Sequence, residues 1–186
     1  MSHGSLELII GPMFSGKSSE LIRKIRLAKI INKKILVIKP LIDNRYDNQK
    51  IVSHSFESEN CITVSTLEEV NDKINNNDLI IIDEGQFFPD LKLHVLRWVE
   101  EYNKNVIVGG LDGDYKRNPI GQILNLIPFA DKCHKINSLC KECNDGTPAL
   151  FTHRKLNPNM SLEQIQVGGS ETYEPLCRNH FILMNQ

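Results

Sequence analysis

The sequence predicts an α/β fold in which a parallel sheet is flanked by helices. Four short runs of consecutive apolar residues alternate with helical patterns along the first two thirds of the chain. Strands that are apolar on both faces are typical of parallel sheets covered on both sides. Near Ile136 the pattern changes to polar residues, Gly, Pro and Cys, without a long periodic segment. We therefore expect an α/β domain over residues 1–135 and a small lobe over 136–186.

The first elements follow in the order that such a sheet requires. Residues 6–10 predict a buried strand, and residues 17–31 predict a helix because their apolar side chains recur at helical spacing. Basic residues occupy the rest of this helix, and they fit a solvated face better than a site for an acidic partner. Residues 35–38 predict the second strand, which ends at Pro40.

The next elements continue the alternation. Ser65 and Glu68 have the spacing of a capping box, so we expect a short helix that begins there and ends in the asparagines 75–77. The remaining predicted elements are a strand at 79–82, a helix with an apolar stripe over 91–99, and a strand at 106–108.

Composition excludes several classes of protein. The 186 residues include 22 Lys and Arg against 23 Asp and Glu, a net charge of −1, so nucleic acid is not the expected partner. No apolar run approaches the roughly 18 residues that cross a membrane, and the first residues lack the pattern of a signal peptide. We expect a cytoplasmic protein, in which the five cysteines bind a metal or remain thiols.

Residues 11–18 match the phosphate-binding pattern G-x-x-x-x-G-K-[ST] between a predicted strand and a predicted helix. Backbone N–H groups of such a loop surround phosphate oxygens, and the helix directs its positive end at the same anion. Lys17 would reach the β and γ phosphates, and the Ser18 hydroxyl would bind Mg²⁺. The predicted nucleotide site comprises Gly11, Pro12, Met13, Phe14, Ser15, Gly16, Lys17 and Ser18. The first domain is therefore expected to be a P-loop (RecA-like) nucleotide-binding domain.

Two carboxylates follow the third apolar strand. Asp83 ends that strand, where a Walker B carboxylate would hold Mg²⁺. Glu84 is a candidate general base toward an acceptor hydroxyl, or the activator of water in an ATPase; the alternative is a plain surface carboxylate. We assign Gly85 and Gln86, which follow, to the same nucleotide site.

A third polar segment, D-N-R-Y at 43–46, lies beyond the second strand. Asp43, Asn44 and Arg45 could reach the phosphates, and an arginine there would stabilise charge on a transferring phosphoryl group. Turn formation explains the same residues equally well.

The C-terminal lobe contains two ligand pairs with the spacing of a zinc site. Cys140 and Cys143 form one pair, and Cys177 and His180 form the other. A redox C-x-x-C is the alternative, but a second ligand pair favours structural zinc. The metal would then join the ends of residues 144–176. Cys61 and Cys133 have no partners at ligand spacing, and we expect packed thiols.

Together these motifs resemble the type II thymidine kinases, the cytosolic, poxvirus and bacterial family. The resemblance runs from Leu6 to His180 and rests on residues 11–18, 43–46, 83–88 (D-E-G-Q-F-F), 111–115 (L-D-G-D-Y) and both ligand pairs. It implies transfer of the γ-phosphoryl group of ATP to the 5′-hydroxyl of thymidine, and also of deoxyuridine. It further implies a homotetramer that dTTP inhibits.

The resemblance also implies roles for single residues. Glu84 would take the 5′-hydroxyl proton, Ser18 and Asp83 would bind Mg²⁺, and Lys17 and Arg45 would face the phosphates. Tyr115 would stack near the base, and Tyr173 would approach the sugar. The pocket would be lined by Met13, Phe87, Leu111 and Thr152, and a loop held by the zinc lobe would clamp the base with Gln164, Ile165, Gln166, Val167 and Gly168.

Three positions depart from the pattern of the animal and poxvirus members. Gln166 replaces an apolar residue, Ile120 replaces a phenylalanine, and His180 replaces a fourth cysteine. Two other classes of protein stay open: a P-loop ATPase whose zinc lobe binds nucleic acid, and a nucleotide-binding module without catalytic activity.

Overall fold

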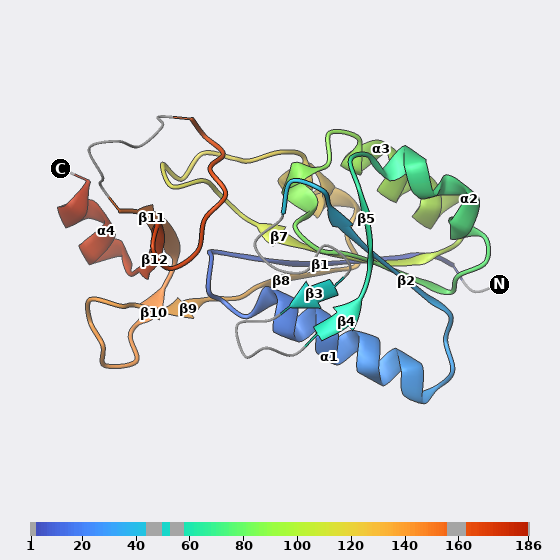
Figure 1. Ribbon diagram of the computed structural model, residues 1–186, viewed down its shortest axis with the longest axis horizontal. Helices are drawn as coiled ribbons and strands as arrows, with labels where there is room; N and C mark the ends of the chain where they lie inside the picture. The colour runs from blue at the N-terminus through green and yellow to red at the C-terminus, as the bar shows by residue number, and fades with distance from the viewer. Residues whose placement is uncertain (1–2, 44–49, 53–57, 156–162, 186) are drawn as a thin grey trace.

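A computed structural model describes residues 3–43, 50–52, 58–155 and 163–185. Six strands within these residues form one central sheet in which every neighbouring pair is parallel (Figure 1). Their order is β5 (Ile62–Val64), β2 (Ile35–Pro40), β6 (Leu79–Ile82), β7 (Asn105–Leu111), β1 (Ser5–Gly11) and β8 (Lys132–Lys135). The predicted α/β class is confirmed.

Helices cover both faces of this sheet. Helix α1 (Lys17–Ile30) packs on one face, where Leu21, Ile22 and Ile25 are buried against strand residues. The other face carries α2 (Asn71–Ile74), α3 (Leu91–Leu96) and the short helical segments η1 (Leu67–Val70), η3 (Arg97–Glu101) and η4 (Ile123–Phe129). Figure 1 shows α1 below the sheet and α2 and α3 above it. Each large apolar side chain buried in these layers contributes about 1.5–3 kcal/mol.

The N-terminal cap of the short helix differs from the prediction by one residue. The carboxylate of Glu69, not Glu68, accepts hydrogen bonds of 2.9 Å from the backbone N–H groups of Ser65 and Thr66. Asp90, from the start of α3, accepts the next two N–H groups, those of Leu67 and Glu68, at 3.1 Å. The capping box therefore forms between Thr66 and Glu69.

The edge strand β8 was not predicted from the sequence. Its four side chains, K-C-H-K, are all exposed, so they give no apolar period. The strand forms because its backbone extends the sheet beside β1. Contrary to expectation, Cys133 in this strand is exposed rather than packed.

The described residues beyond β8, 136–155 and 163–185, form a small lobe at the left end of Figure 1. Two antiparallel ribbons, β9 (Ser138–Leu139) with β10 (Pro148–Ala149) and β11 (Phe151–Arg154) with β12 (Tyr173–Leu176), precede α4 (Arg178–Met184). The lobe has its own apolar cluster around Ala149, Leu176 and Phe181.

A third ribbon, β3 (Lys50–Val52) with β4 (Ser58–Asn60), lies beside α1. Among the residues that the structure describes, no helix is long and apolar enough to span a membrane.

Candidate active site

The phosphate loop connects β1 to α1 at the carboxyl edge of the sheet. Gly16, which precedes the helix, has a φ of 83°, a conformation that glycine adopts without steric cost. A Cβ atom on Gly11 would lie 2.2 Å from the Ile136 carbonyl oxygen, so this position cannot hold a side chain without a backbone shift. The Ser15 hydroxyl donates a hydrogen bond of 2.8 Å to the Pro12 carbonyl and tightens the turn. The loop thus has the backbone that a phosphate cradle needs.

The expected magnesium ligands lie next to each other. The Ser18 hydroxyl donates a hydrogen bond of 3.1 Å to Oδ2 of the buried Asp83, which follows β6. A hydroxyl and a carboxylate are the hard oxygen donors that Mg²⁺ prefers, so this pair could hold the ion together with nucleotide phosphates. Lys17 donates to the Pro12 carbonyl at 2.6 Å and lies folded along the loop.

Glu84 is held in one orientation by its neighbours. It is buried, and its backbone is left-handed, with φ 49° and ψ 43°. This conformation is costly for a residue with a side chain, and such strain concentrates at functional sites. Gln86 donates a hydrogen bond of 2.7 Å to Glu84 Oε2 and accepts one of 3.0 Å from the Leu111 backbone N–H. Gln86 thus orients the carboxylate, and Gly85 beside it packs against Val108.

A pocket opens beside Glu84 and encloses about 550 Å³ of space, including the solvent at its mouth. It brings together side chains from the sheet edge, the loop 112–119 and the lobe. The residues that line it are Met13, Asp43, Glu84, Phe87, Leu111, Gly113, Asp114, Tyr115, Ile120, Thr152, Gln164, Ile165, Gln166, Val167, Gly168 and Tyr173. Every residue expected to contact the nucleoside is in this set.

Asp43 and Thr152, both expected near the site, line this pocket. Asp43 is buried, lines the pocket and lies 3.9 Å from the Lys39 ammonium group. Asn44 and Arg45 lie outside the described residues. Thr152 lines the pocket and accepts a hydrogen bond of 2.9 Å from the Met13 backbone N–H, which joins the lobe to the phosphate loop.

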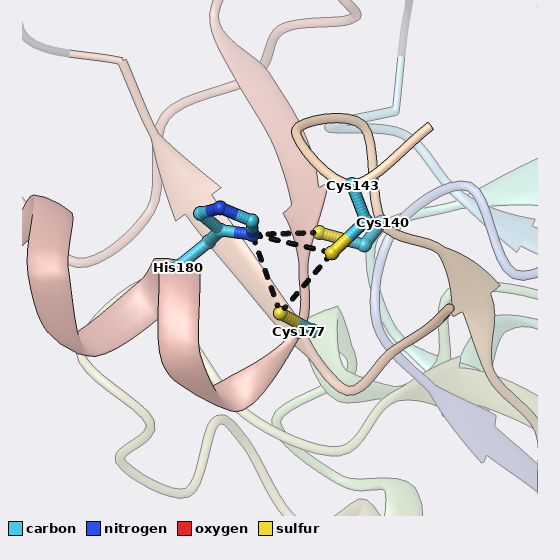
Figure 2. Close-up of side chains that lie close together, drawn as sticks. All are labelled: Cys140, Cys143, Cys177 and His180. Atoms are coloured by element: carbon cyan, nitrogen blue, oxygen red, sulfur yellow. Dashed lines mark hydrogen bonds between the residues drawn. The ribbon is translucent and has the colours of Figure 1, made fainter. Parts of the chain in front are cut away.

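The four predicted metal ligands converge in the lobe (Figure 2). Their ligand atoms all lie within 4.8 Å of one another. His180 Nδ1 is 3.6 Å from Cys140 Sγ and 3.4 Å from each of Cys143 and Cys177 Sγ, and the last two sulfurs are 3.8 Å apart. A tetrahedral Zn²⁺ with bonds of 2.0–2.3 Å needs separations of about 3.3–3.8 Å. The Cys₃His set could therefore form a structural zinc site.

Protonation of this cluster is uneven in the absence of metal. Burial opposes ionisation of the Cys140 thiol, but hydrogen bonds from the backbone of Cys177 and Cys143 and from His180 lower its pKa to about 6. Burial raises the pKa of Cys143 to about 11, and the neighbouring sulfurs of Cys140 and Cys177 add to this rise. Binding of Zn²⁺ would displace the protons that remain on these thiols.

Asp114 and Arg154 have contacts at the pocket wall that were not predicted from the sequence. Asp114 is buried in the pocket wall, and its Oδ1 accepts the backbone N–H groups of Lys116 and Asn118 at 2.8 Å, which shapes the loop around Tyr115. Arg154 is buried behind the same wall, with its guanidinium carbon 3.7 Å from the centroid of the Tyr115 ring. Asp114 lies inside the L-D-G-D-Y segment, and this was the only feature of the sequence that pointed to a role at the site. Arg154 belongs to none of the motifs found in the sequence.

The fold and this site define a P-loop nucleotide-binding protein with a second, largely apolar pocket beside an oriented carboxylate. A family model described as thymidine kinase matches residues 4–181, nearly the whole chain. The chain belongs to the thymidine kinase family, and its class of activity is that of a nucleoside kinase.

Proposed function

We propose that the protein transfers the γ-phosphoryl group of ATP to the 5′-hydroxyl of thymidine, and also of deoxyuridine, in pyrimidine salvage, with dTMP as the product from thymidine. The observation that carries this proposal is the pair Asp83 and Glu84. Asp83 contacts Ser18 of the phosphate loop, whereas Glu84 lines the adjacent pocket. Two consecutive carboxylates thus serve a phosphate site and an acceptor site that meet at the sheet edge.

The phosphates of ATP would be held by the backbone N–H groups of residues 11–18 and by Lys17. Bound Mg²⁺ would neutralise charge on the β and γ phosphates. Ser18 and Asp83 would hold this ion. Arg45, outside the described residues, would add positive charge near the transferred group.

Glu84 would act as the general base. Its carboxylate accepts the proton of the 5′-hydroxyl while the 5′-oxygen bonds to the γ-phosphorus and the bond to the leaving ADP oxygen breaks. Gln86 favours this role because its hydrogen bond to Glu84 Oε2 fixes the carboxylate where it lines the pocket. A fixed base is effective because its orientation is set before the substrate arrives.

The pyrimidine would lie against Tyr115, between apolar side chains of the sheet edge and the backbone of residues 164–168. Backbone N–H and C=O groups can pair with the O2, N3–H and O4 edge of thymine, and a base that leaves them unpaired is rejected. Tyr173, expected near the sugar, donates its hydroxyl to the Gln166 carbonyl at 2.7 Å. It would therefore support the loop as well as border the sugar.

The division into a P-loop domain, 1–135, and a zinc lobe, 136–186, is part of this proposal. The zinc ion would hold the ends of the segment that includes residues 164–168, so that the loop is ordered before thymidine binds. We also propose a cytoplasmic homotetramer that dTTP inhibits, with no nucleic-acid or membrane partner.

A nucleoside panel tests the proposal. The full chain with Zn²⁺, Mg²⁺ and ATP is assayed for ADP release with thymidine, deoxyuridine, deoxycytidine, deoxyadenosine, deoxyguanosine or single-stranded DNA. We expect turnover with thymidine and deoxyuridine and formation of the 5′-monophosphate. ATP hydrolysis that single-stranded DNA stimulates and thymidine does not would favour the nucleic-acid-dependent ATPase instead.

A further inference from the structure

We propose that Arg154 is a positioning residue for the nucleoside site, which holds Tyr115 and the base-clamping loop in the arrangement that binds thymidine. The inference rests on the proposed function, and it assigns to that site a residue that does not itself border it. Among the described residues that line the pocket, Arg154 is absent. It contacts residues that do line the pocket, among them Tyr115 and Gln164.

The guanidinium group of Arg154 holds the start of the loop by two hydrogen bonds. Arg154 is the last residue of β11 and is only 6% exposed. Its Nη1 donates to the Glu163 carbonyl at 2.8 Å, and its Nη2 donates to the Gln164 carbonyl at 3.2 Å. A planar fork with several N–H groups can reach two successive carbonyls at once, which a lysine ammonium group cannot do with the same geometry.

The same group supports the aromatic wall of the pocket. The distance of 3.7 Å between the guanidinium carbon and the centroid of the Tyr115 ring is that of a close stack. A cation over an aromatic face is attracted by the ring, more strongly where water is excluded. Tyr115 lines the pocket, so the Arg154 stack fixes the ring against which the base would lie.

A second path of contacts runs through Tyr173. Arg154 Nη2 donates to the Tyr173 hydroxyl at 3.0 Å, and this hydroxyl donates to the Gln166 carbonyl at 2.7 Å. Arg154 therefore reaches the loop at Glu163, at Gln164 and, through Tyr173, at Gln166. These contacts fix backbone carbonyl groups in and next to the loop 164–168, whose backbone would form hydrogen bonds with the pyrimidine.

A direct link between the two loops completes this arrangement. The Gln164 carboxamide donates a hydrogen bond of 2.9 Å to Asp114 Oδ2 and another of 3.2 Å to the Pro119 carbonyl. Asp114 shapes the turn that carries Tyr115. Tyr115 and the clamping loop are thus joined twice, once through Arg154 and once through Gln164.

The experiment compares Arg154→Met and Arg154→Lys with a matched control, Arg117→Met. Arg117 also stacks on aromatic rings of the lobe, 4.8 Å from the centroid of Phe181 and 5.5 Å from that of Phe151, but it is exposed and does not line the pocket. The full zinc-loaded chain is assayed for kcat, for KM with thymidine and for KM with ATP. Zinc content and melting temperature are measured for each variant.

We expect Arg154→Met to raise the KM for thymidine ~10- to 100-fold, because charge-assisted hydrogen bonds are lost. The KM for ATP should stay within about twofold, since the phosphate loop has its own supports. Arg154→Lys keeps the charge and the aliphatic stem, so the lobe stays folded, and it should recover only part of the loss. Arg117→Met should match the wild type.

A thymidine KM within about threefold of the wild type in both Arg154 variants would overturn the inference. So would equal increases in both KM values, or an effect of Arg117→Met as large as that of Arg154→Met. In each of these cases the proposed function would still hold if the wild-type chain phosphorylates thymidine. A wild-type chain that phosphorylates no nucleoside would overturn the proposed function, and the role of Arg154 with it.

Discussion

The backbone N–H of Met13 donates a hydrogen bond of 2.9 Å to the hydroxyl of Thr152, a residue 139 positions further along the chain. This buried contact joins the phosphate loop to strand β11 of the lobe. Side chains alternate along a strand, so Thr152 and Arg154 face the pocket region while His153 faces α4, beside Phe181 and Asn185. One strand therefore connects the interior of the lobe to the pocket beside Glu84 and to the phosphate loop.

Replacing Thr152 with valine tests this connection. Valine has nearly the same shape but leaves the buried Met13 N–H without its acceptor, so Thr152→Val should lower the free energy of unfolding by about 1–3 kcal/mol. Urea denaturation of the zinc-loaded chain measures the loss. Thr152→Ser, which keeps the hydroxyl, is the control and should lose less. Equal stability of the two variants would show that the hydrogen bond contributes little.

Removing the charge of Glu84 tests the proposed general base. Glu84→Gln should reduce kcat for thymidine by about 10²- to 10⁴-fold, the usual contribution of a positioned base. ATP affinity should hardly change, because Asp83 and the phosphate loop are untouched. Asp112→Asn is a matched control: this carboxylate follows β7 at the same edge of the sheet but pairs with Lys135 at 2.8 Å. An unchanged rate in Glu84→Gln would remove Glu84 from the base role.

Removing one of the four candidate ligands tests the function of the proposed zinc site. Cys140→Ser should lower the zinc content and raise the KM for thymidine about tenfold. Without the metal, residues 164–168 would become ordered only when thymidine binds, and the free energy needed for this ordering would weaken binding. Its ATP affinity should be close to that of the wild type. Cys133→Ser, at an exposed thiol of β8, is the control and should change neither constant. Equal losses of thymidine and ATP affinity would contradict a role confined to the nucleoside loop.

The pH dependence of stability tests the packing of His153. Burial lowers the pKa of His153, and the Glu174 carboxylate, 4.0 Å away, opposes that shift only in part. The unfolded chain therefore binds more protons at this residue below about pH 6.5, so stability falls as the pH drops through the folded pKa. His153→Gln removes this contribution, and its melting temperature should fall less than that of the wild type between about pH 7.5 and about pH 5.5. The four candidate metal ligands titrate in both proteins, so they contribute equally to both pH dependences. An equal fall in melting temperature in the wild type and in His153→Gln would therefore contradict the assignment to His153.

The strands of the sheet could be predicted where burial leaves a pattern in the sequence. Strands β1, β2, β6 and β7 are apolar on both faces because helices cover both faces. Strand β8 left no such pattern, since its four side chains are exposed while its backbone pairs with β1. The cap of the short helix was misplaced by one residue because two pairs have the required spacing, Ser65 with Glu68 and Thr66 with Glu69. Asp90, more than 20 positions away, accepts the next two N–H groups, and the sequence gives no sign of this contact.

The site was predictable where chemistry imposes a spacing. The phosphate loop and the two ligand pairs have fixed intervals, because backbone amides must surround a phosphate and sulfurs must surround a metal. Asp114 and Arg154 had no such interval. Their contacts form between loops that are distant in the sequence, and the same residue types are common on solvated surfaces.

The most direct test of the account is a crystal structure of the zinc-loaded chain with thymidine and a non-hydrolysable ATP analogue. We predict that the 5′-oxygen lies about 2.6–3.2 Å from a Glu84 carboxylate oxygen, with the base against Tyr115 and the terminal phosphate in the loop 11–18. A structure in which the analogue occupies that loop while thymidine lies outside the pocket, or turns its 5′-oxygen away from Glu84, would contradict the account.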